Sequence, residues 1–207
     1  MTFFGIDLNA DGDTQDSVAY LLDTSVAPGL MINLNFAVAT TKLNQGDMFL
    51  GVFEPFQGGI DFNGNGIIND VVQFYFDIGD SPHTMRGLGV VTAAFTLDRT
   101  AAGEVRVAAR MQEGQSPNFG DLNGDGDLSD VGLVLISIDA TANPPVTVSP
   151  TPFFAGTAAA GSAPPIRIDD GTFVFPTAEA MDLTDYNGDG DMLDTVLRYT
   201  RIRPPGP

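Results

Sequence analysis

The sequence predicts an all-β fold built from four hairpin repeats, and three observations support this prediction. An acidic loop of ten residues recurs four times along the 207-residue chain. The segments next to these loops are rich in β-branched and aromatic residues and show no helical period. The intervals between hairpins hold further strand-like runs, so that each repeat contains about four strands. We therefore expect one all-β repeat domain over residues 1–207.

The four acidic loops share the pattern D-x-N-x-[DN]-G-x-x-x-D. Their first aspartates are 54, 60 and 64 residues apart, which indicates an internal repeat of supersecondary size. We number them loops 1 to 4 in chain order. They are DLNADGDTQD at 7–16, DFNGNGIIND at 61–70, DLNGDGDLSD at 121–130 and DYNGDGDMLD at 185–194.

Strand-like runs flank the loops, so each loop is expected at the tip of a hairpin. The runs that precede loops 2, 3 and 4 are MFLGVFEPFQ (48–57), EVRVAARMQE (104–113) and TFVFPTAEA (172–180). The runs that follow the four loops are SVAYLLD (17–23), VVQFYFD (71–77), VGLVLISID (131–139) and TVLRYT (195–200). Further strands are expected at GLMINLNF (29–36), FAVATTKL (36–43) and VTAAFTL (91–97).

Several of these runs are apolar on both faces, which is typical of sheets that are covered on both sides. Four-stranded repeats of this kind suit a propeller-like fold of about four blades, and a β-sandwich is the alternative. The chain starts and stops within a repeat, so we expect either an excerpt of a longer array or a seam whose open edges pair with neighbouring copies. The Pro-, Ala- and Thr-rich segment 141–165 is expected to be an irregular surface loop.

Composition narrows the classes of function. The net charge is -18, yet 43% of residues are hydrophobic, which argues against a disordered acidic tail. So acidic a chain is a poor nucleic-acid binder. It has no cysteine for disulfides or thiolate metal sites, and no apolar run long enough to span a bilayer. Its first residues, MTFFGIDLNAD, show no signal peptide.

The loop pattern places oxygen ligands where a hard dication needs them. Side chains at positions 1, 3 and 5 converge, glycine at position 6 permits the sharp turn, and position 7 can offer its carbonyl. The EF-hand interpretation fails because position 12 holds Val18, Val72, Gly132 or Val196 rather than glutamate. Simple hairpin turns would explain the Asp-Gly and Asn-Gly pairs, but they need no acid at position 10. Four repeated acids there favour calcium.

An apolar strand ending in Glu, followed by a D-x-N-G-D-G-D-x-x-D loop and a second strand, resembles repeats of bacterial exported β-propeller-type proteins. It is more distantly similar to integrin-like propeller repeats. The resemblance implies up to four calcium ions, with loop 2 the weakest because Asn65 and Ile67 replace aspartates. The implied ligands are Asp7, Asn9, Asp11, Asp13 and Asp16; Asp61, Asn63, Asn65, Ile67 and Asp70; Asp121, Asn123, Asp125, Asp127 and Asp130; and Asp185, Asn187, Asp189, Asp191 and Asp194.

A glutamate near the end of the strand before each of loops 2, 3 and 4 has two interpretations. Glu54, Glu113 and Glu179 lie 7, 8 and 6 residues before the first loop aspartate. In the first interpretation they are additional ligands or groups that hold the ligands in place. In the second they are ordinary solvated charges at strand ends. The sequence leaves both interpretations open.

The usual parts of an active site are missing from the sequence. His83 is the one histidine, in a turn-like stretch, and no P-loop lysine accompanies the glycines. We therefore expect no catalytic residues and no organic cofactor. The glutamates could form the carboxylate pair of a hydrolase or lyase, but catalytic pairs do not recur with each repeat.

The prediction that fits these features best is a non-catalytic, extracellular or cell-surface, calcium-binding structural or adhesive protein. Open strand edges suggest self-association into a surface fibre. The alternative is a propeller module that binds a glycan or protein, although the chain has no tryptophan to stack on sugars.

Overall fold

The computed structural model describes residues 5–44, 46–79, 85–91, 95–99, 104–115, 120–139, 153–157, 166–169 and 172–201. Over these residues the protein is all-β apart from three short helical segments, which confirms the predicted class. The chain divides into two compact units, residues 1–90 and 91–207, which are described separately. The turn predicted around His83 lies outside the described residues.

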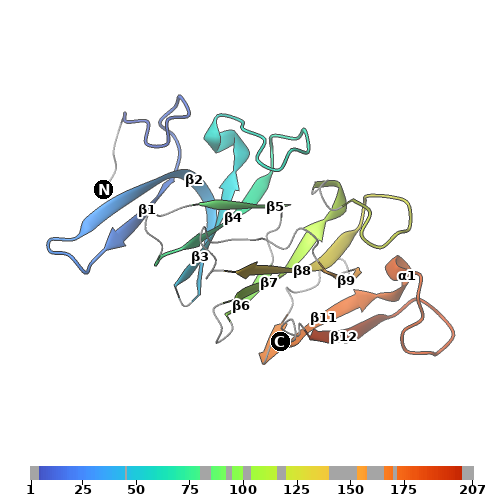
Figure 1. Cartoon of the computed structure of the whole chain (residues 1–207). Helices are drawn as coiled ribbons and strands as arrows, with labels where there is room; N and C mark the ends of the chain where they lie inside the picture. Colours follow the sequence, from blue (N-terminus) through green and yellow to red (C-terminus); the bar gives the residue numbers. More distant parts are fainter. Residues whose placement is uncertain are drawn as a thin grey trace. The chain divides into compact units, whose positions relative to one another are not determined.

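The first unit is built on a five-stranded sheet in which neighbours along the chain are neighbours in the sheet (Figure 1). The strand pairs β1–β2, β2–β3 and β3–β4 are antiparallel. The strands are β1 (Val18–Asp23), β2 (Leu30–Asn44), β3 (Asp47–Phe53), β4 (Val71–Asp77) and β5 (Arg86–Val91).

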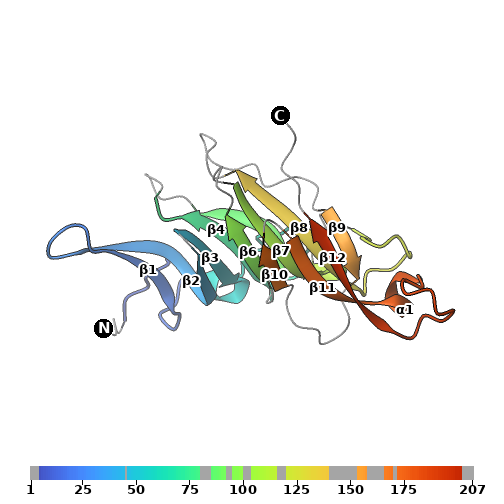
Figure 2. The same ribbon diagram turned by 90° about the horizontal axis from the view of Figure 1, so that it is seen from below.

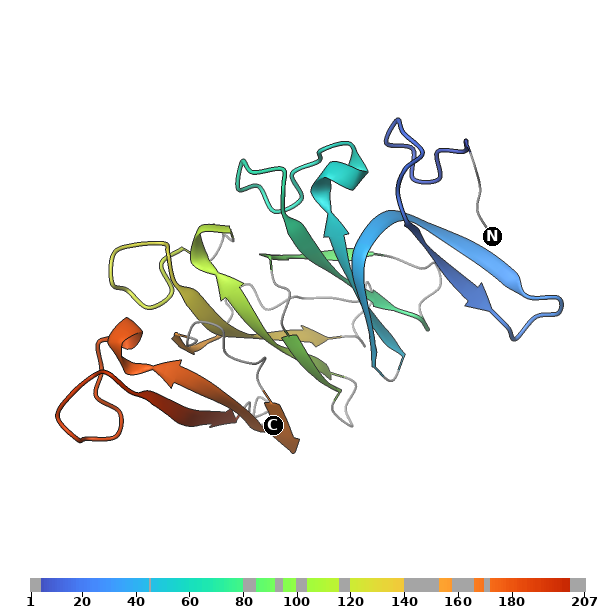
Figure 3. The ribbon, with the colours of Figure 1, turned by 180° about the vertical axis from the view of Figure 1, so that it is seen from behind.

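Strand β2 corrects one prediction. Residues 29–36 and 36–43 were expected to form two strands, but they belong to one strand of 15 residues. The first half of β2 pairs with β1 and the second half with β3. The register shifts in both pairings, and Asn35 adopts a left-handed conformation with φ of 59°. Such irregularities bend a strand, and the ribbon of β2 curves accordingly in Figure 3.

The core of the first unit lies around β3 and β4. The large side chains of Phe49, Tyr75 and Phe76 are at most 1% exposed, so both faces of these strands are covered as predicted. Loop 2 is attached to this core by Phe62, whose ring lies 5.2 Å from that of Phe74. Burial of aromatic side chains therefore fixes the base of the loop.

The second unit contains a four-stranded sheet, ordered β6-β7-β8-β9, and a three-stranded sheet, ordered β10-β11-β12. Strand β11 and helix α1 both contact β9, and Figure 2 shows the strands of this unit from below. Phe173 of β11 is buried in one cluster with Ala108 and Leu135, so the two sheets share a core. The strands are β6 (Phe95–Arg99), β7 (Glu104–Gln112), β8 (Val131–Asp139), β9 (Phe153–Thr157), β10 (Ile166–Asp169), β11 (Thr172–Ala178) and β12 (Thr195–Arg201).

Two further predictions need correction. Residues 91–97 were expected to form one strand, but β5 ends at Val91 and β6 begins at Phe95. Segment 141–165 was expected to be irregular, yet residues 153–157 form β9, which pairs with β8 and lengthens the sheet. The other residues of that segment lie outside the described part of the chain.

Loops 2, 3 and 4 connect the antiparallel pairs β3–β4, β7–β8 and β11–β12, as the sequence predicts. A short helical turn stands between the first strand of each pair and its loop (Figure 3). These turns are η1 (Glu54–Gln57), η2 (Glu113–Gln115) and α1 (Glu179–Asp182). Among the described residues, no helix has the length and apolar character needed to cross a membrane.

Candidate metal centres

The first aspartate of each loop organises the backbone around it. In loop 3, the two carboxylate oxygens of Asp121 accept hydrogen bonds from the Gly124 and Gly126 amides at 2.6 and 2.8 Å. Gly126 has φ of +98°, which residues with a side chain rarely adopt, and this explains the glycine at position 6. The equivalent bonds occur in loops 1, 2 and 4 at 2.6 to 2.9 Å.

Positions 3, 5 and 7 continue the same pattern along the chain. In loop 3, Asn123 Oδ1 accepts the Asp125 amide at 3.1 Å, and Asp125 Oδ1 accepts the Asp127 amide at 3.0 Å. Asp127 Oδ1 in turn accepts the Ser129 amide at 2.7 Å. Each side chain uses one oxygen to shape the loop, and the Asn123 amide nitrogen also donates to Oδ2 of Asp130 at 2.7 Å.

The glutamate before the loop lies opposite the aspartate that ends it. The amides of Glu54, Glu113 and Glu179 donate to the carbonyl oxygens of Asp70, Asp130 and Asp194 at 3.0, 3.1 and 3.0 Å. All three glutamates are buried, with exposures of 0, 1 and 0%. The interpretation of these residues as solvated strand-end charges is therefore wrong.

The buried carboxylates hold the start of each loop. Glu113 Oε1 accepts the amide of Leu122 at 2.8 Å, and Glu179 Oε1 accepts the amide of Tyr186 at 2.7 Å. The other oxygens, Glu113 Oε2 and Glu179 Oε2, are buried and have no hydrogen-bond partner. A buried carboxylate oxygen without a donor is costly, and a cation beside it would offset this cost.

Other acidic side chains converge on these unpartnered glutamates. Carboxylate oxygens of Glu113, Asp127 and Asp130 all lie within 4.8 Å of one another. The equivalent trio in loop 4 is Glu179, Asp191 and Asp194, again within 4.8 Å. Three carboxylates this close repel one another in the absence of a cation. A hard divalent cation, which prefers oxygen ligands, would suit this cluster.

The electrostatics of loop 3 reflect this crowding. Burial raises the pKa of Glu113, and the neighbouring charges of Asp130 and Asp121 raise it further against the hydrogen bond from Leu122. Burial likewise raises the pKa of Asp130, helped by the charge of Asp125. Both carboxyl groups therefore keep their protons to a higher pH than a solvated carboxyl group does.

Loop 1 forms its cluster from its own residues. Carboxylate oxygens of Asp11, Asp13 and Asp16 lie within 4.8 Å of one another. Burial, together with the hydrogen bond and charge of Asp11, raises the pKa of Asp16 to about 6. The cluster thus resembles loops 3 and 4 in its unbalanced negative charge.

Loop 2 differs from the other loops in a way that matches its sequence. Asn65, which replaces aspartate at position 5, donates its amide to Asp70 Oδ2 at 2.6 Å. Both oxygens of Glu54 accept backbone amides, from Phe62 at 2.7 Å and from Asp70 at 3.3 Å. In loop 2, therefore, an uncharged amide replaces the carboxylate that the other loops carry at position 5, and both oxygens of Glu54 have donors.

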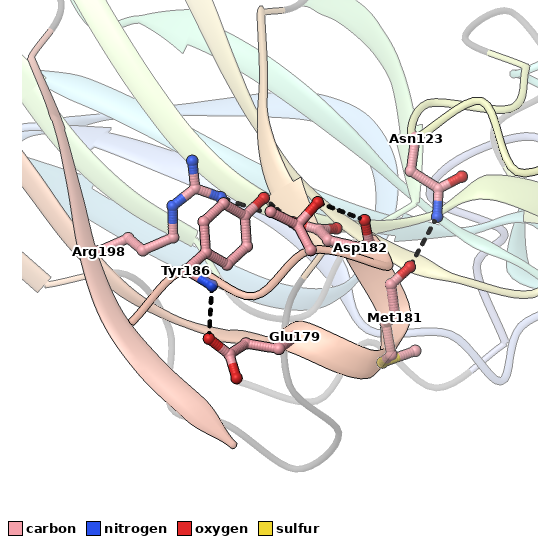
Figure 4. Close-up of polar contacts among 7 residues, drawn as sticks. Asn123, Glu179, Met181, Asp182, Tyr186 and Arg198 are labelled. Atoms are coloured by element: carbon pink, nitrogen blue, oxygen red, sulfur yellow. Dashed lines mark hydrogen bonds and ion pairs between the residues drawn. The ribbon is translucent and has the colours of Figure 1, made fainter. Parts of the chain in front are cut away.

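Loop 4 is attached to its hairpin by an aromatic and ionic contact (Figure 4). The Tyr186 hydroxyl donates to Asp182 Oδ2 at 2.7 Å, and the Arg198 guanidinium lies 4.0 Å from the centre of the Tyr186 ring. Arg198 also approaches Asp182 at 3.5 Å. Position 2 of the loop is thus an anchor, as Phe62 is in loop 2.

The structure separates the predicted ligands into two groups. The aspartates at positions 7 and 10 meet in loops 1, 3 and 4, and buried Glu113 and Glu179 join them in the last two. The residues at positions 1 and 3 contribute mainly to hydrogen bonds that shape the loop. Sequence reasoning left the glutamates undecided, although their recurrence beside the closing aspartate was the signal that could have favoured them.

Comparisons with protein-family models, curated proteins and solved structures found no match for this chain.

Proposed function

We propose that this chain is a non-catalytic structural β protein whose repeat loops bind calcium. The observation that carries the proposal is the pair of buried oxygens, Glu113 Oε2 and Glu179 Oε2, which have no hydrogen-bond donor. Each lies in a cluster with two further carboxylates. Such oxygens are stable when they coordinate a cation.

Calcium fits these clusters better than other common metals. The ligands are carboxylate, amide and carbonyl oxygens, and the chain holds no cysteine and one histidine. Thiolate and imidazole ligands are what zinc and copper sites require. Calcium accepts six to eight oxygens in flexible geometry, which suits a loop with several short acidic side chains.

The loops are proposed to bind with different strength. Loops 3 and 4 each combine a buried, unpartnered glutamate oxygen with two aspartates. Loop 1 offers three aspartates, and loop 2 satisfies Asp70 and Glu54 with amide groups of its own. We therefore expect loop 2 to be the weakest of up to four sites.

The propeller-like interpretation of the repeat is also part of the proposal. Strands β6, β7, β8 and β9 are ordered as a four-stranded meander, which is the strand order within a propeller blade. Strands β10, β11 and β12 repeat the first three positions of that order. A loop-bearing hairpin occupies the second and third positions of each such sheet.

Two further features support a structural role outside the cell. Fourteen of the 27 acidic residues lie in the four loops, so cation binding would remove repulsion where it is greatest. Extracellular modules often use calcium in place of a larger core or disulfides. The recurring glutamates are assigned to the loops, which leaves the hydrolase or lyase alternative without its carboxylate pair.

Self-association is the proposed mode of assembly, and β12 supports it. Leu197 and Tyr199 of β12 are 74 and 76% exposed. The equivalent positions of β8 hold Leu133 and Leu135, which are 1 and 6% exposed. The same apolar positions are therefore buried in one repeat and exposed in another. Exposed apolar patches of this kind are typical of protein–protein interaction surfaces. A protein or glycan ligand at the repeats remains the second candidate function.

Thermal unfolding of the whole chain in calcium, magnesium or chelator tests the proposal. Calcium is expected to raise the melting temperature more than magnesium does, because the ion binds the folded loops only. Asp127→Asn should reduce this increase, whereas Asp23→Asn, which removes the same charge outside the loops, should not. Equal melting temperatures in calcium and chelator would contradict the proposal.

A further inference from the structure

A hydrogen bond that crosses from one repeat to the next recurs at equivalent positions. The side-chain amide of Asn123 in loop 3 donates to the carbonyl oxygen of Met181 at 3.4 Å (Figure 4). The side-chain amide of Asn9 in loop 1 donates to the carbonyl oxygen of Phe56 at 2.7 Å. Both donors occupy position 3 of a loop. Both acceptors lie two residues after the buried glutamate that precedes the next loop.

The loop 1 contact has a second component. Gly58, which ends η1, packs against loop 1, because a Cβ placed on it would lie 3.4 Å from the carbonyl oxygen of Asp11. The turn before loop 2 therefore contacts loop 1 through one hydrogen bond and one close backbone approach. This arrangement shows that the cross-repeat contact is a property of the repeat rather than of one residue pair.

In the second unit, the contact joins the two strongest candidate centres. The Asn123 amide also donates to the closing Asp130 of loop 3 at 2.7 Å. Met181 lies in α1, the turn that begins with Glu179. Glu179 Oε1 accepts amides at the start of loop 4, and its Oε2 is the buried oxygen without a donor.

We propose that loops 3 and 4 bind calcium with positive cooperativity, transmitted through the Asn123–Met181 hydrogen bond. This inference rests on the calcium sites proposed above. The relevant path is short: Glu179 belongs to the loop 4 cluster, Met181 follows in the same turn, and Asn123 joins Met181 to Asp130 of the loop 3 cluster.

The physical reason lies in the order of α1. An ion in loop 4 holds the Glu179 carboxylate and with it the single turn of α1, so the Met181 carbonyl becomes fixed. That carbonyl orients the Asn123 amide, which in turn positions the Asp130 carboxylate of the loop 3 cluster. Groups that orient a metal ligand commonly change metal affinity by about 10- to 100-fold when they are removed. The ordering cost that the first ion meets is therefore smaller for the second.

Nuclear magnetic resonance of the full chain can follow each loop separately. The amides of Gly126 and Gly190 donate to the first aspartates of loops 3 and 4, at 2.8 and 2.9 Å, so their resonances report the state of each loop. The protein is stripped of metal with chelator and titrated with calcium chloride at fixed salt. The calcium midpoint of each glycine resonance is the measured quantity.

Asp191→Asn weakens loop 4 without touching loop 3. We expect it to raise the calcium midpoint of Gly126 by about fivefold or more, the lower end of typical coupling between sites. Because coupling is reciprocal, Asp127→Asn should raise the midpoint of Gly190 by the same factor. Asp13→Asn in loop 1 removes an equal charge and should leave the Gly126 midpoint unchanged.

The bond itself is tested by Asn123→Asp, which keeps an oxygen at position 3 but removes the donor to Met181. In this background Asp191→Asn should shift the Gly126 midpoint by less than twofold, since the link is absent and only long-range electrostatics between the two loops persist. Asn187→Asp is the matched control in loop 4, where the amide donates to Asp189 and Asp194 of its own loop. In that background the coupling seen at Gly126 should survive.

The outcomes separate this inference from the function on which it rests. If Gly126 and Gly190 respond to calcium but Asp191→Asn leaves the Gly126 midpoint unchanged, the coupling is overturned and the calcium sites stand. If coupling persists in the Asn123→Asp background, the assigned bond is overturned. If neither glycine responds to calcium, the proposed function fails, and the coupling fails with it.

Discussion

The amide of Glu179 donates a hydrogen bond to the carbonyl oxygen of Asp194 at 3.0 Å, which places the glutamate before loop 4 opposite the aspartate that ends it. The same main-chain bond joins Glu113 to Asp130. Since these residues close the hairpin, their carboxylates approach each other whatever the path of the intervening loop. The hairpin register is therefore what assembles the acidic cluster.

Replacing a buried glutamate tests its role as a ligand. Glu113→Gln keeps an oxygen to accept the Leu122 amide but removes a charge from the cluster. We expect about tenfold weaker calcium binding at loop 3, which lowers calcium-dependent stabilisation by about 1.4 kcal/mol when calcium is saturating. Calcium-dependent thermal unfolding measures the difference.

Glu54→Gln is the matched control for this prediction. Both Glu54 oxygens accept backbone amides, so its replacement should lower stability in chelator and calcium alike. A calcium response that falls as much in Glu54→Gln as in Glu113→Gln would show that the buried glutamates act on the fold alone.

Loop 2 should gain a calcium site when its missing acid is restored. Asn65→Asp removes the amide that donates to Asp70 and adds a carboxylate at position 5. We expect lower stability in chelator, because the two carboxylates then repel, and tighter calcium binding at loop 2. Calorimetric titration should show the weakest site strengthen, and an unchanged isotherm would contradict the assignment of loop 2.

The raised carboxyl pKa values predict opposite pH trends with and without calcium. The pKa of Asp16 is raised to about 6 by burial and by Asp11, and that of Glu113 is raised by burial. A carboxyl group whose pKa is raised by folding stabilises the folded state fully at a pH below its pKa in the unfolded chain, about 4. This contribution is lost as the pH rises through the pKa of the group in the folded chain. In chelator, the melting temperature should therefore fall between pH 5 and pH 7.

Two conditions complete the pH prediction. Hydrogen bonds from Ser129 lower the pKa of Asp127, so this residue adds stability that is lost as the pH falls. That loss occurs below about pH 4, outside the range from pH 5 to pH 7. With calcium present, binding requires ionised carboxylates, so the calcium-dependent increase in melting temperature should grow from pH 5 to pH 7. A melting temperature in chelator that rises over this range would count against the clusters.

Self-association should depend on the exposed residues of β12. Light scattering on a sizing column in calcium is expected to show species larger than a monomer. Tyr199→Lys should shift them toward monomer, because it places a charge on an apolar surface that is 76% exposed at this residue. Ile60→Lys, at another exposed apolar residue, is the control. If the wild-type chain is monomeric in calcium, the fibre interpretation is wrong.

Much of the fold followed from the sequence because the strands beside the loops are strongly apolar. Strands β4 and β8 lie where continuous runs of β-branched and aromatic residues predicted them. Strand β2 was misjudged because its polar residues resemble a break, whereas a register shift and the left-handed Asn35 let one strand bend between two partners. Local pattern does not report such a change of partner.

The candidate sites were predictable to a similar depth. The recurrence of an acid at position 10 identified the loops, since a turn alone does not need it. The burial of Glu113 and Glu179 was not predictable, because a charge at a strand end is usually solvated. The contact from Asn123 to Met181 uses a backbone carbonyl, and every residue carries one, so the sequence held no signal for it.

Isothermal titration calorimetry of the metal-stripped chain with calcium tests the central claim most directly. The account predicts saturable binding at up to four sites, with one site weaker than the others, and loss of heat from a strong site in Glu113→Gln. Magnesium should bind more weakly, because it requires stricter octahedral geometry. An isotherm without saturable calcium binding would contradict the account.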